Sequence, residues 1–592
     1  MPKRVVVLGA GVGGLTAAHE LAERGYAVTV YERMNAFGGK ARSIPKPKSG
    51  THQRQDLPGE HGFRFFPGFY RHVIDTMRRI PFHHGDNVAG NLVAASQSML
   101  ARFDCPSLTG VIGFPRTWEQ LKTFIHQILQ GNGVSFGENL HFMRCLLVMA
   151  TSSMKRVNKE YDWIPYWTFI DAEHHSEQYR ELLAEGLTRS LVAMKAESSS
   201  TRTIATVFCQ MIYPMLNPFR HADRLLCAPT DIVWIFPWVS YLMTLGVQYQ
   251  METLATGFEA YPDAPRLRTI SLLHNYGFPP SATLTDGQDF DYAISALPVD
   301  GMAKILSTPA GQKFVQRAPG LEGIAELETR WMNGVQFYLK EDVPLVHGHI
   351  LYVSTPWALT AISQKQFWQQ FELTTSGDGC TRGVLSVDIS EWAKPGIEIK
   401  KKACECTKEE IAIEVWAQLK RSHNVNGKKV LPDQVPEYFM DDCISPDNVD
   451  PFANSDQASS KNPYGDHFNL EPLFINTVGS HRFRPKADFG FENFFLASDY
   501  VRTYTDLATM EGANEAARRA VNALLDRDGS KAPRAKVWHL HQPWYVQPWQ
   551  ALDEWRFRRG LPNLFSTPEM RLQPEQKQAE EKAEAKVKGT GA

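Results

Sequence analysis

The hydrophobic pattern at the start of the chain predicts a strand, a helix and a second strand. Four consecutive apolar residues, Val5 to Leu8, are typical of a short buried strand. A helical pattern follows over residues 15–24 and stops at Gly25. Residues 28–31 then form another apolar run of mostly β-branched side chains. This order of elements is the first half of a nucleotide-binding α/β unit.

The turn after the first strand carries three glycines at a spacing that suits a dinucleotide. Gly9 permits a tight turn, Gly11 lets the backbone approach a pyrophosphate, and Gly14 allows the helix to pack closely on the strand. Glu32 ends the second strand, where a carboxylate can accept the hydroxyls of an adenosine ribose. We expect an ADP-containing dinucleotide here, and a plain glycine-rich turn is the alternative interpretation.

A second strand and helix near the C-terminus complete this picture. The apolar run Phe494 to Ala497 is followed by Asp499, and residues 510–513 open a helix. The start of a helix presents unpaired N–H groups and partial positive charge. Such a helix end can stabilise the negative charge that accumulates on a reduced flavin. The ligand is therefore expected to be longer than ADP.

Between these two ends, the pattern alternates between helical and strand-like segments. Residues 140–154 place Leu140, Met143, Leu146, Leu147 and Ala150 on one stripe, which we interpret as an amphipathic helix packed on the core. Residues 333–340 and 348–354 alternate enough to be neighbouring strands of one sheet, and residues 290–298 form another short strand. Residues 231–247 are apolar but interrupted by Pro237, which favours a buried segment or a cavity wall.

Composition narrows the function classes. A chain of 592 residues is too long for one core, and its net charge of −2 (63 basic against 65 acidic residues) gives no basic excess for nucleic acid. The eight cysteines lack the paired spacing of a zinc site, so we expect free thiols and no metal. The chain has no run of about 18 apolar residues and enters its first strand at once, which predicts a cytoplasmic protein.

Both ends of the chain resemble the flavin-containing amine oxidoreductase superfamily. The similar motifs are the opening glycine fingerprint with Glu32-Arg33, then Gly38 to Ser43, and the distant Leu496 to Asp499 and Met510 to Ala513. That superfamily includes amine oxidases, protoporphyrinogen oxidase and phytoene-desaturase-type enzymes, and the chain resembles the last of these, the carotenoid and squalene type. The resemblance implies an α/β fold: a discontinuous Rossmann-type FAD-binding domain with an inserted α+β substrate domain.

The implied domain order alternates between cofactor and substrate parts. We expect FAD-binding segments at 1–90, 241–300 and 476–530, a mainly helical cap at 91–240, a substrate domain with a sheet at 301–475, a Trp-rich extension at 531–572 and a tail at 573–592 that is disordered or a frayed helix.

The resemblance also implies which residues hold FAD. The expected cofactor-binding residues are Gly9, Gly11, Gly14, Glu32, Arg33, Gly39, Lys40, Arg42, Gly62, Phe63, Asp499, Met510, Glu511, Gly512 and Ala513. Lys40 departs from the arginine usual in the family, and Arg42 can share its role. Because no cysteine follows Cys443, the late cysteine that attaches flavin in some amine oxidases is missing, so FAD is expected to be non-covalent.

Residues 59–70 are the expected wall beside the flavin, and they supply the candidate catalytic residues. In one interpretation Glu60, His61 and Arg64 are polar groups at the reaction centre. In the other, this loop only packs on the first strand, with Arg64 paired to Glu60. Hydride transfer between a substrate carbon and flavin N5 needs orientation and a dry pocket, and no acid–base pair.

The substrate expectation rests on apolar content and is open. Eight aromatic residues suggest a hydrophobic cleft: Trp234, Phe236, Trp238, Tyr241, Phe337, Tyr352, Trp357 and Phe367. We expect a desaturase acting on an isoprenoid, carotenoid-like or other lipid substrate; an amine oxidase and a non-redox isomerase using reduced FAD are the alternatives. The Trp-rich residues 537–559 are either a tail wrapped over the body or a peripheral contact with the membrane surface.

Overall fold

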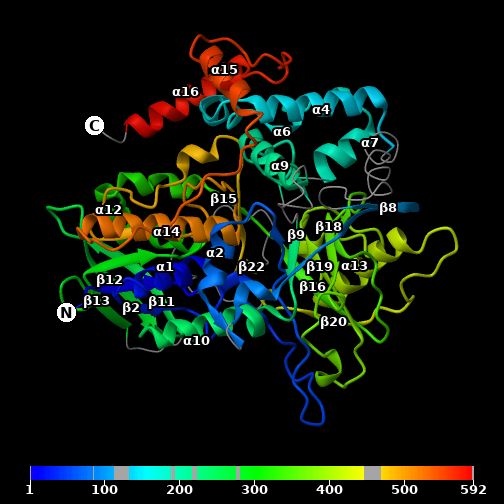
Figure 1. Cartoon of the computed structure of the whole chain (residues 1–592), viewed down its shortest axis with the longest axis horizontal. Coiled ribbons are helices and arrows are strands. Elements are labelled where there is room, and N and C mark those ends of the chain that lie inside the picture. The colour runs from blue at the N-terminus through cyan, green and yellow to red at the C-terminus, as the bar shows by residue number, and fades with distance from the viewer. Residues whose placement is uncertain are drawn as a thin grey trace.

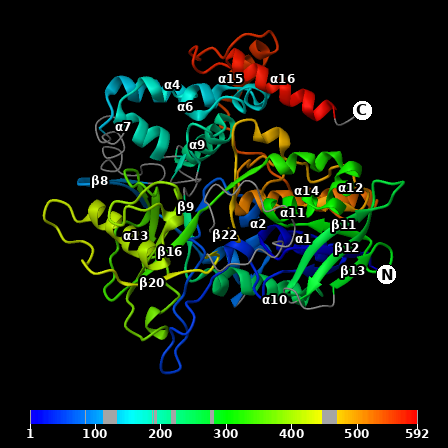
Figure 2. The ribbon, with the colours of Figure 1, turned by 180° about the vertical axis from the view of Figure 1, so that it is seen from behind.

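The computed structural model describes residues 2–83, 86–111, 133–186, 188–189, 194–215, 223–274, 281–445 and 468–589. Figures 1 and 2 show the chain as a Rossmann domain beside a domain built on a large mixed sheet, with a helical part above both. The chain crosses between these parts several times. Segments far apart in sequence therefore build each part, as the predicted α/β fold with an inserted α+β domain requires.

The Rossmann domain is centred on a five-stranded parallel sheet. The strand order is β10-β2-β1-β14-β24, with bounds β1 (Arg4–Leu8), β2 (Ala27–Tyr31), β10 (Gln248–Gln250), β14 (Tyr292–Ser295) and β24 (Phe494–Leu496). All four pairings are parallel. Val5, Val7 and Leu8 are at most 1% exposed, as expected for strands covered on both faces.

The helices and the small second sheet of this domain come from segments that are far apart in the sequence. They are α1 (Val12–Ala22), α2 (His72–Arg79), α10 (Phe236–Thr244), α11 (Val299–Ser307), α12 (Pro309–Arg317) and α14 (Met510–Arg527), with β11 (Thr253–Ala260), β12 (Leu267–His274) and β13 (Ser281–Thr285). Helix α1 packs on α14 and α10, and α12 packs on β11. Helix α1 begins at Val12, three residues earlier than the sequence predicts, so Gly13 and Gly14 lie in its first turn.

The second domain is built on a seven-stranded mixed sheet. Its order is β20-β16-β19-β18-β17-β7-β8, with bounds β7 (Gln97–Arg102), β8 (Cys105–Val111), β16 (Asn333–Leu339), β17 (Gly348–Tyr352), β18 (Leu359–Ser363), β19 (Gly383–Ile389) and β20 (Glu437–Met440). Helix α13 (Lys408–His423) covers it, with Trp416 packed 4.9 Å from Phe337. The two strands predicted as neighbours do share this sheet, but β18 and β19 lie between them.

The helical part has its own aromatic core. It comprises α4 (Phe136–Thr151), α5 (Met154–Arg156), α6 (Tyr166–Phe169), α7 (Glu177–Tyr179) and α9 (Thr201–Met215), and α15 (Gln547–Phe557) packs on α4 and α5. The expected apolar stripe of α4 is not its buried face. Leu140, Met143 and Leu147 are 62%, 51% and 43% exposed, whereas Val148 and Met149 are buried. The core-packing interpretation of that stripe was wrong for these side chains.

Short strands and turns connect the parts. They are β3 (Phe66–Pro67), β4 (Pro81–Phe82), β5 (Asp86–Asn87), β6 (Leu92–Ala94), β9 (Asp223–Leu226), β15 (Glu328–Arg330), β21 (Ile444–Ser445), β22 (Phe468–Asn469) and β23 (Leu473–Ile475). No helix in the described part of the chain is both long and apolar enough to cross a membrane.

Several expected domain boundaries need correction. Trp234 and Trp238, expected in the cap, belong to the core of the Rossmann domain. Met302 and Phe314, expected in the substrate domain, belong to the same core. Residues 97–111, at the start of the expected mainly helical region, form strands β7 and β8 of the mixed sheet. The tail, expected to be either disordered or a frayed helix, forms helix α16 (Pro574–Gly589), because Glu, Lys, Gln and Ala are all strong helix formers.

Candidate functional site

A cavity of about 370 Å³ lies where the Rossmann sheet meets the mixed sheet. It opens at the carboxyl ends of β1, β14 and β24, the edge at which parallel sheets bind ligands. Most of the predicted site residues line this cavity: Gly9, Gly11, Glu32, Arg33, Gly39, Lys40, Arg42, His61, Gly62, Phe63, Arg64, Asp499, Met510 and Ala513. The structure thus brings both ends of the sequence to one cavity.

The glycine turn is shaped by close backbone approach. Gly9 has φ +100°, which other residues rarely adopt, and a Cβ on Gly14 would lie 1.8 Å from the Gly9 carbonyl oxygen. Gly14 therefore packs the helix on the strand and does not line the cavity, as its predicted packing role requires. Gly11 precedes α1 with no side-chain cap, so the first N–H groups of α1 are available to an anion.

Glu32 is held at the cavity by the backbone. Its Oε2 accepts from Ala10 N at 2.7 Å and its Oε1 from Met34 N at 2.8 Å. Burial raises the pKa of the Glu32 carboxyl, and these two N–H groups act in the opposite direction. The carboxylate keeps lone pairs for two further donors such as ribose hydroxyls.

The basic residues predicted to meet phosphate are paired with an acid that the sequence did not reveal. Arg42 Nη1 donates to Glu471 at 2.7 and 2.9 Å, and Arg33 lies 3.3 Å from the same carboxylate. Lys40 Nζ donates to the Pro472 carbonyl. Burial raises the pKa of Glu471, but Arg42 outweighs it and brings the value to about 2. Glu471 thus fixes Arg42 and Arg33 along one wall, and the neighbouring Pro472 carbonyl holds Lys40.

At the far end of the cavity, two of the predicted residues do not reach it. Glu511 is buried and accepts from the backbone N of Arg71, His72 and Val73 at 2.6 to 2.9 Å, so it holds the start of α2. Gly512 donates to Thr509 Oγ1 at 3.1 Å in the first turn of α14. Their assignment as cofactor contacts is corrected to a structural role, whereas Met510 and Ala513 of the same turn do line the cavity.

The three candidate catalytic residues do not share one location: His61 and Arg64 line the cavity, and Glu60 does not. Glu60 lies outside the cavity lining and accepts from Thr230 N and Oγ1 at 2.9 and 2.7 Å. Arg64 lines the cavity and donates to backbone carbonyls, among them Ala41 at 3.2 Å. The predicted pairing of Arg64 with Glu60 is therefore replaced by main-chain contacts, and Glu60 is a buried structural acid.

His61 lines the cavity and belongs to a buried polar cluster. Its Nδ1 lies 2.6 Å from Asp441 Oδ2, 3.6 Å from Glu471 Oε2 and 3.8 Å from Cys443 Sγ. Burial opposes ionisation of Asp441, yet His61 lowers the carboxyl pKa to about 2. His61, Asp441 and Cys443 place ligand-type atoms within 4.8 Å of one another. The sequence predicted no metal site, and a separation of 380 residues hides such a cluster from spacing arguments.

The mixed sheet contributes a polar wall that the sequence did not predict. Asp388, Thr360 and His349 line the cavity from β19, β18 and β17, and Thr360 is paired in register with Asp388. Asp388 Oδ1, Thr360 Oγ1 and His349 Nε2 are buried without a hydrogen-bond partner among the described residues. We call these three residues the polar wall. Polar residues inside otherwise apolar strand runs were the available signal.

The surroundings of Asp388 are shaped for its carboxylate. A Cβ on Gly62 or Gly334 would lie 2.7 or 2.9 Å from Asp388 Oδ1, so both glycines leave space for that oxygen. Burial raises the pKa of Asp388 to about 7, and it lowers the pKa of His349 to about 4. Near neutral pH, Asp388 can hold or release a proton inside the cavity.

The aromatic residues predicted to form the cleft are elsewhere. None of the eight lines the cavity. Trp238, for example, donates to His19 Nδ1 at 3.0 Å inside the Rossmann domain, and Trp357 donates to the Lys394 carbonyl. The apolar lining comes instead from residues such as Phe65, Tyr70 and Met332. Ordinary core packing explains six of the eight, whereas Tyr241 is half-buried and Phe236 is exposed.

Comparison with known proteins identifies two family models in this chain. Residues 7–80 match a model described as NAD(P)-binding Rossmann-like domain, and residues 265–525 match flavin containing amine oxidoreductase. An L-amino acid oxidase of Lachesis muta is 43% identical over 63 residues, 10% of this chain and 12% of that protein. Protoporphyrinogen oxidase 2 of Arabidopsis thaliana is 57% identical over 42 residues, 7% and 8% of the two chains. The matches thus span about an eighth or less of these relatives.

Solved structures share the fold at low sequence identity. Putrescine oxidase bound to putrescine superposes with a TM-score of 0.55 at 12% identity, covering 89% of this chain and 99% of that one. Cyclohexylamine oxidase from Brevibacterium oxydans gives 0.54 at 12% identity, covering 89% and 100%. The two motif-bearing ends of the chain thus gather at one cavity, and the matched residues make the chain similar to flavin-containing amine oxidoreductases and to Rossmann-like dinucleotide-binding domains.

Proposed function

We propose that this chain is an FAD-dependent oxidoreductase. The observation that carries the proposal is the continuity of one cavity from Glu32 and the glycine turn to Met510 at the start of α14. A ligand that meets both needs an adenosine end and a second ring system, which FAD has. When bound, FAD supplies hydride exchange at its flavin ring.

The chain's own residues fit that cofactor. Glu32 would accept the ribose hydroxyls, and the uncapped start of α1 would bind the pyrophosphate. The start of α14, with Met510 and Ala513 on the cavity, would face the flavin end. Cys443 is the last cysteine in the sequence and hydrogen-bonds to Asn333, which supports non-covalent binding.

The substrate we propose is a hydrophobic molecule with one polar group. Phe63, Phe65 and Met332 offer apolar surface on the substrate side of the cavity. One polar atom of each polar-wall residue would otherwise remain buried without a partner among the described residues, which is costly. A hydroxyl or nitrogen group on the substrate would satisfy it. A dehydrogenase or desaturase acting on an isoprenoid-like or other lipid substrate, in a cytoplasmic protein of the phytoene-desaturase type, fits both features.

A second candidate is an amine oxidase, favoured by Asp388, whose carboxylate could accept a proton from a substrate nitrogen. The two candidate functions predict different molecules as the substrates that reduce the bound flavin. Anaerobic mixing with a panel of amines should leave the flavin absorbance unchanged if the substrate is a lipid. Mass spectrometry of a turned-over lipid should show the loss of two hydrogens, whereas an unchanged mass would indicate the isomerase alternative.

The cofactor assignment is tested by retention of FAD. The purified protein should be yellow and should release intact FAD on denaturation. Glu32→Ala should weaken FAD binding by about tenfold or more, because it removes the ribose acceptor. Glu437→Ala, which removes a partly exposed acid bonded to Lys46, is the matched control and should bind FAD normally. Colourless protein that stays free of FAD when FAD is added would contradict the assignment.

A further inference from the structure

Large apolar side chains gather on the outer surface at one end of the molecule. Along α4, Phe136, Leu140 and Met143 are 68%, 62% and 51% exposed, and they lie at helical spacing on one stripe. In the C-terminal segment Trp544 and Trp555 are 80% and 49% exposed. We call the exposed side chains of α4 and of residues 544–564 the apolar end surface. Exposed apolar groups concentrated in this way mark an interaction site.

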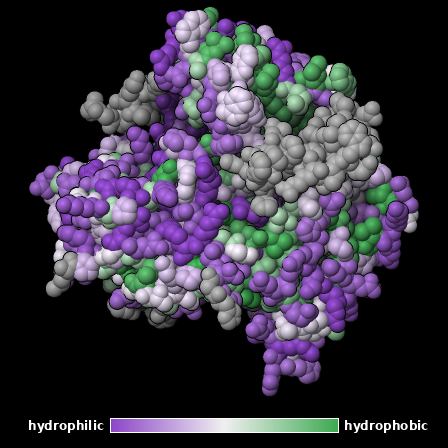
Figure 3. All heavy atoms as spheres, viewed as in Figure 1, coloured by the Kyte–Doolittle hydropathy of each residue, from purple (hydrophilic) through white to green (hydrophobic). Residues whose placement is uncertain are grey.

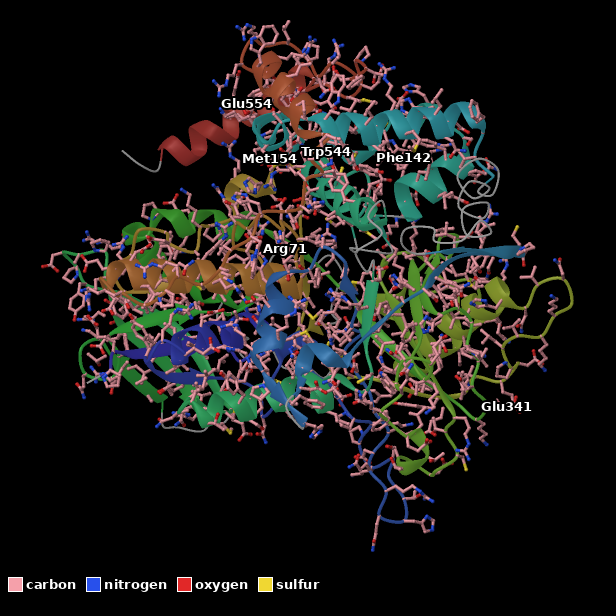
Figure 4. All side chains as sticks on the ribbon, viewed as in Figure 1. Arg71, Phe142, Met154, Glu341, Trp544 and Glu554 are labelled. Atoms are coloured by element: carbon pink, nitrogen blue, oxygen red, sulfur yellow. The ribbon has the colours of Figure 1, made fainter. Side chains whose placement is uncertain are left out.

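The two segments of this surface are fixed to each other. Arg144 Nε donates to the Phe565 carbonyl at 2.7 Å, and Gln550 Nε2 donates to the Ala150 carbonyl at 3.0 Å. Figures 1 and 2 show α4 and α15 at the same end of the molecule, and Figure 3 shows green side chains over them. Figure 4 places Met154 and Trp544 at this end as well. The C-terminal segment is thus docked, yet its aromatic rings face outward.

Cations accompany these apolar groups. Arg144, Lys155, Arg558 and Arg559 are exposed here, and the Arg559 guanidinium lies 3.9 Å from the centre of the Trp555 ring. Tryptophan and arginine side chains with apolar bodies and polar ends suit the boundary between lipid headgroups and acyl chains. A two-fold contact with a second copy would instead bring cations of the same surface together.

We propose that the apolar end surface binds the interface of a bilayer that contains anionic phospholipids. Trp544, Leu140 and Phe136 enter the boundary between headgroups and acyl chains, and the arginines contact phosphates. The attachment is peripheral, because no helix among the described residues can span the bilayer. The surface is separate from the cavity, so the proposal does not depend on the cofactor or the substrate.

Co-sedimentation of the full chain with vesicles tests this proposal. The protein should sediment with vesicles of phosphatidylcholine and phosphatidylglycerol, and less with phosphatidylcholine alone. The double variant Leu140→Gln/Trp544→Ser should lose sedimentation, and since both side chains are exposed its unfolding temperature should stay unchanged. Arg559→Gln should weaken binding to the anionic vesicles about fivefold.

Phe236→Ser is the matched control. Phe236 is 53% exposed on α10, in the Rossmann domain, and its replacement should leave vesicle binding intact. Equal sedimentation of wild type and the double variant, or none by wild type, would overturn the proposal. Light scattering after size-exclusion chromatography is the second readout. A dimer that the double variant abolishes would assign the surface to a second copy and would also overturn it.

Discussion

At the scale of single residues, the cavity is defined by side chains whose environment differs from what their sequence position suggests. Glu32, His61 and Arg42 were predictable because they stand in or beside recognisable motifs. Asp388 and Glu471 were harder to predict: a polar residue inside an apolar strand marks Asp388 as unusual without showing what it faces, and Glu471 follows a polar stretch. Their importance comes from three-dimensional neighbours: Gly62 and Gly334 for Asp388, and Arg42 for Glu471.

Asp388 leads to a prediction about pH and stability. Because its pKa is raised to about 7 in the folded protein, the folded state retains this proton while the unfolded chain loses it near pH 4. This carboxyl therefore stabilises the fold below pH 4 and progressively less as the pH rises to about 7. Asp388→Asn cannot ionise, so it should raise the free energy of unfolding at pH 8 by about 1–3 kcal/mol.

Urea denaturation of the FAD-free protein at pH 4 and pH 8 measures this effect. The gain should be nearly absent at pH 4, where the wild-type carboxyl is protonated in the folded state and about half protonated in the unfolded chain. Turnover by Asp388→Asn should be slower, and the increase in rate with pH that we expect of the wild type around pH 7 should be missing from the variant. An equal change in stability at both pH values would mean that the effect is steric and unrelated to ionisation.

At the scale of elements, the ends of the chain were predictable and the middle was less so. Strands β1 and β24 and helix α14 follow the expected ranges within a few residues, because glycine fingerprints and apolar runs mark them locally. Pairing in the mixed sheet was not local: β16 and β17 follow each other in sequence but are separated by two strands that come later. The alternation of apolar and polar residues along a strand predicts which side chains share a face of the sheet, but it does not predict the order of the strands in the sheet.

The contact between α1 and β24 gives a prediction at this scale. A Cβ on Gly13 would lie 2.0 Å from the Ala497 carbonyl oxygen, so Gly13→Ala must push the helix away from that strand end. We expect a loss of about 1–3 kcal/mol in the free energy of unfolding, together with weaker FAD retention. Gly137→Ala in α4 is the control, since nothing lies within 4 Å of its Cβ.

The control should be neutral or stabilising by up to about 1 kcal/mol, because alanine favours helix. Thermal unfolding and the absorbance ratio of flavin to protein are the measurements. If Gly13→Ala behaves like Gly137→Ala, the close approach of α1 to β24 is not a constraint on the fold.

At the scale of the whole molecule, buried ion pairs join segments that are distant in sequence. Arg156 and Asp553 are each 2% exposed, and Arg156 Nε lies 3.0 Å from Asp553 Oδ1. Asp553 also accepts from Ser153 N at 2.8 Å. These contacts attach α15, in the C-terminal segment, to the helical part. The arrangement of the apolar end surface therefore depends on them.

Asp553→Ala should therefore destabilise the protein by about 3 kcal/mol, since it leaves the Arg156 charge buried without this partner. Its neighbour provides the control: Glu554 is partly exposed and paired with Lys155 and Arg558 on the surface. Glu554→Ala should leave the free energy of unfolding nearly unchanged. Chemical denaturation measures both, and equal effects would rule out burial as the cause.

The interleaving of the chain also has a consequence for its biosynthesis. Strand β1 pairs with β14, and β14 pairs with β24, which is made nearly last. At about 5–20 residues per second, the ribosome needs roughly ten to forty seconds to reach β24 after completing β14. During that interval the exposed edge of β14 lacks its neighbour and can pair with other chains. Newly made protein should therefore depend on chaperones until α14 has emerged.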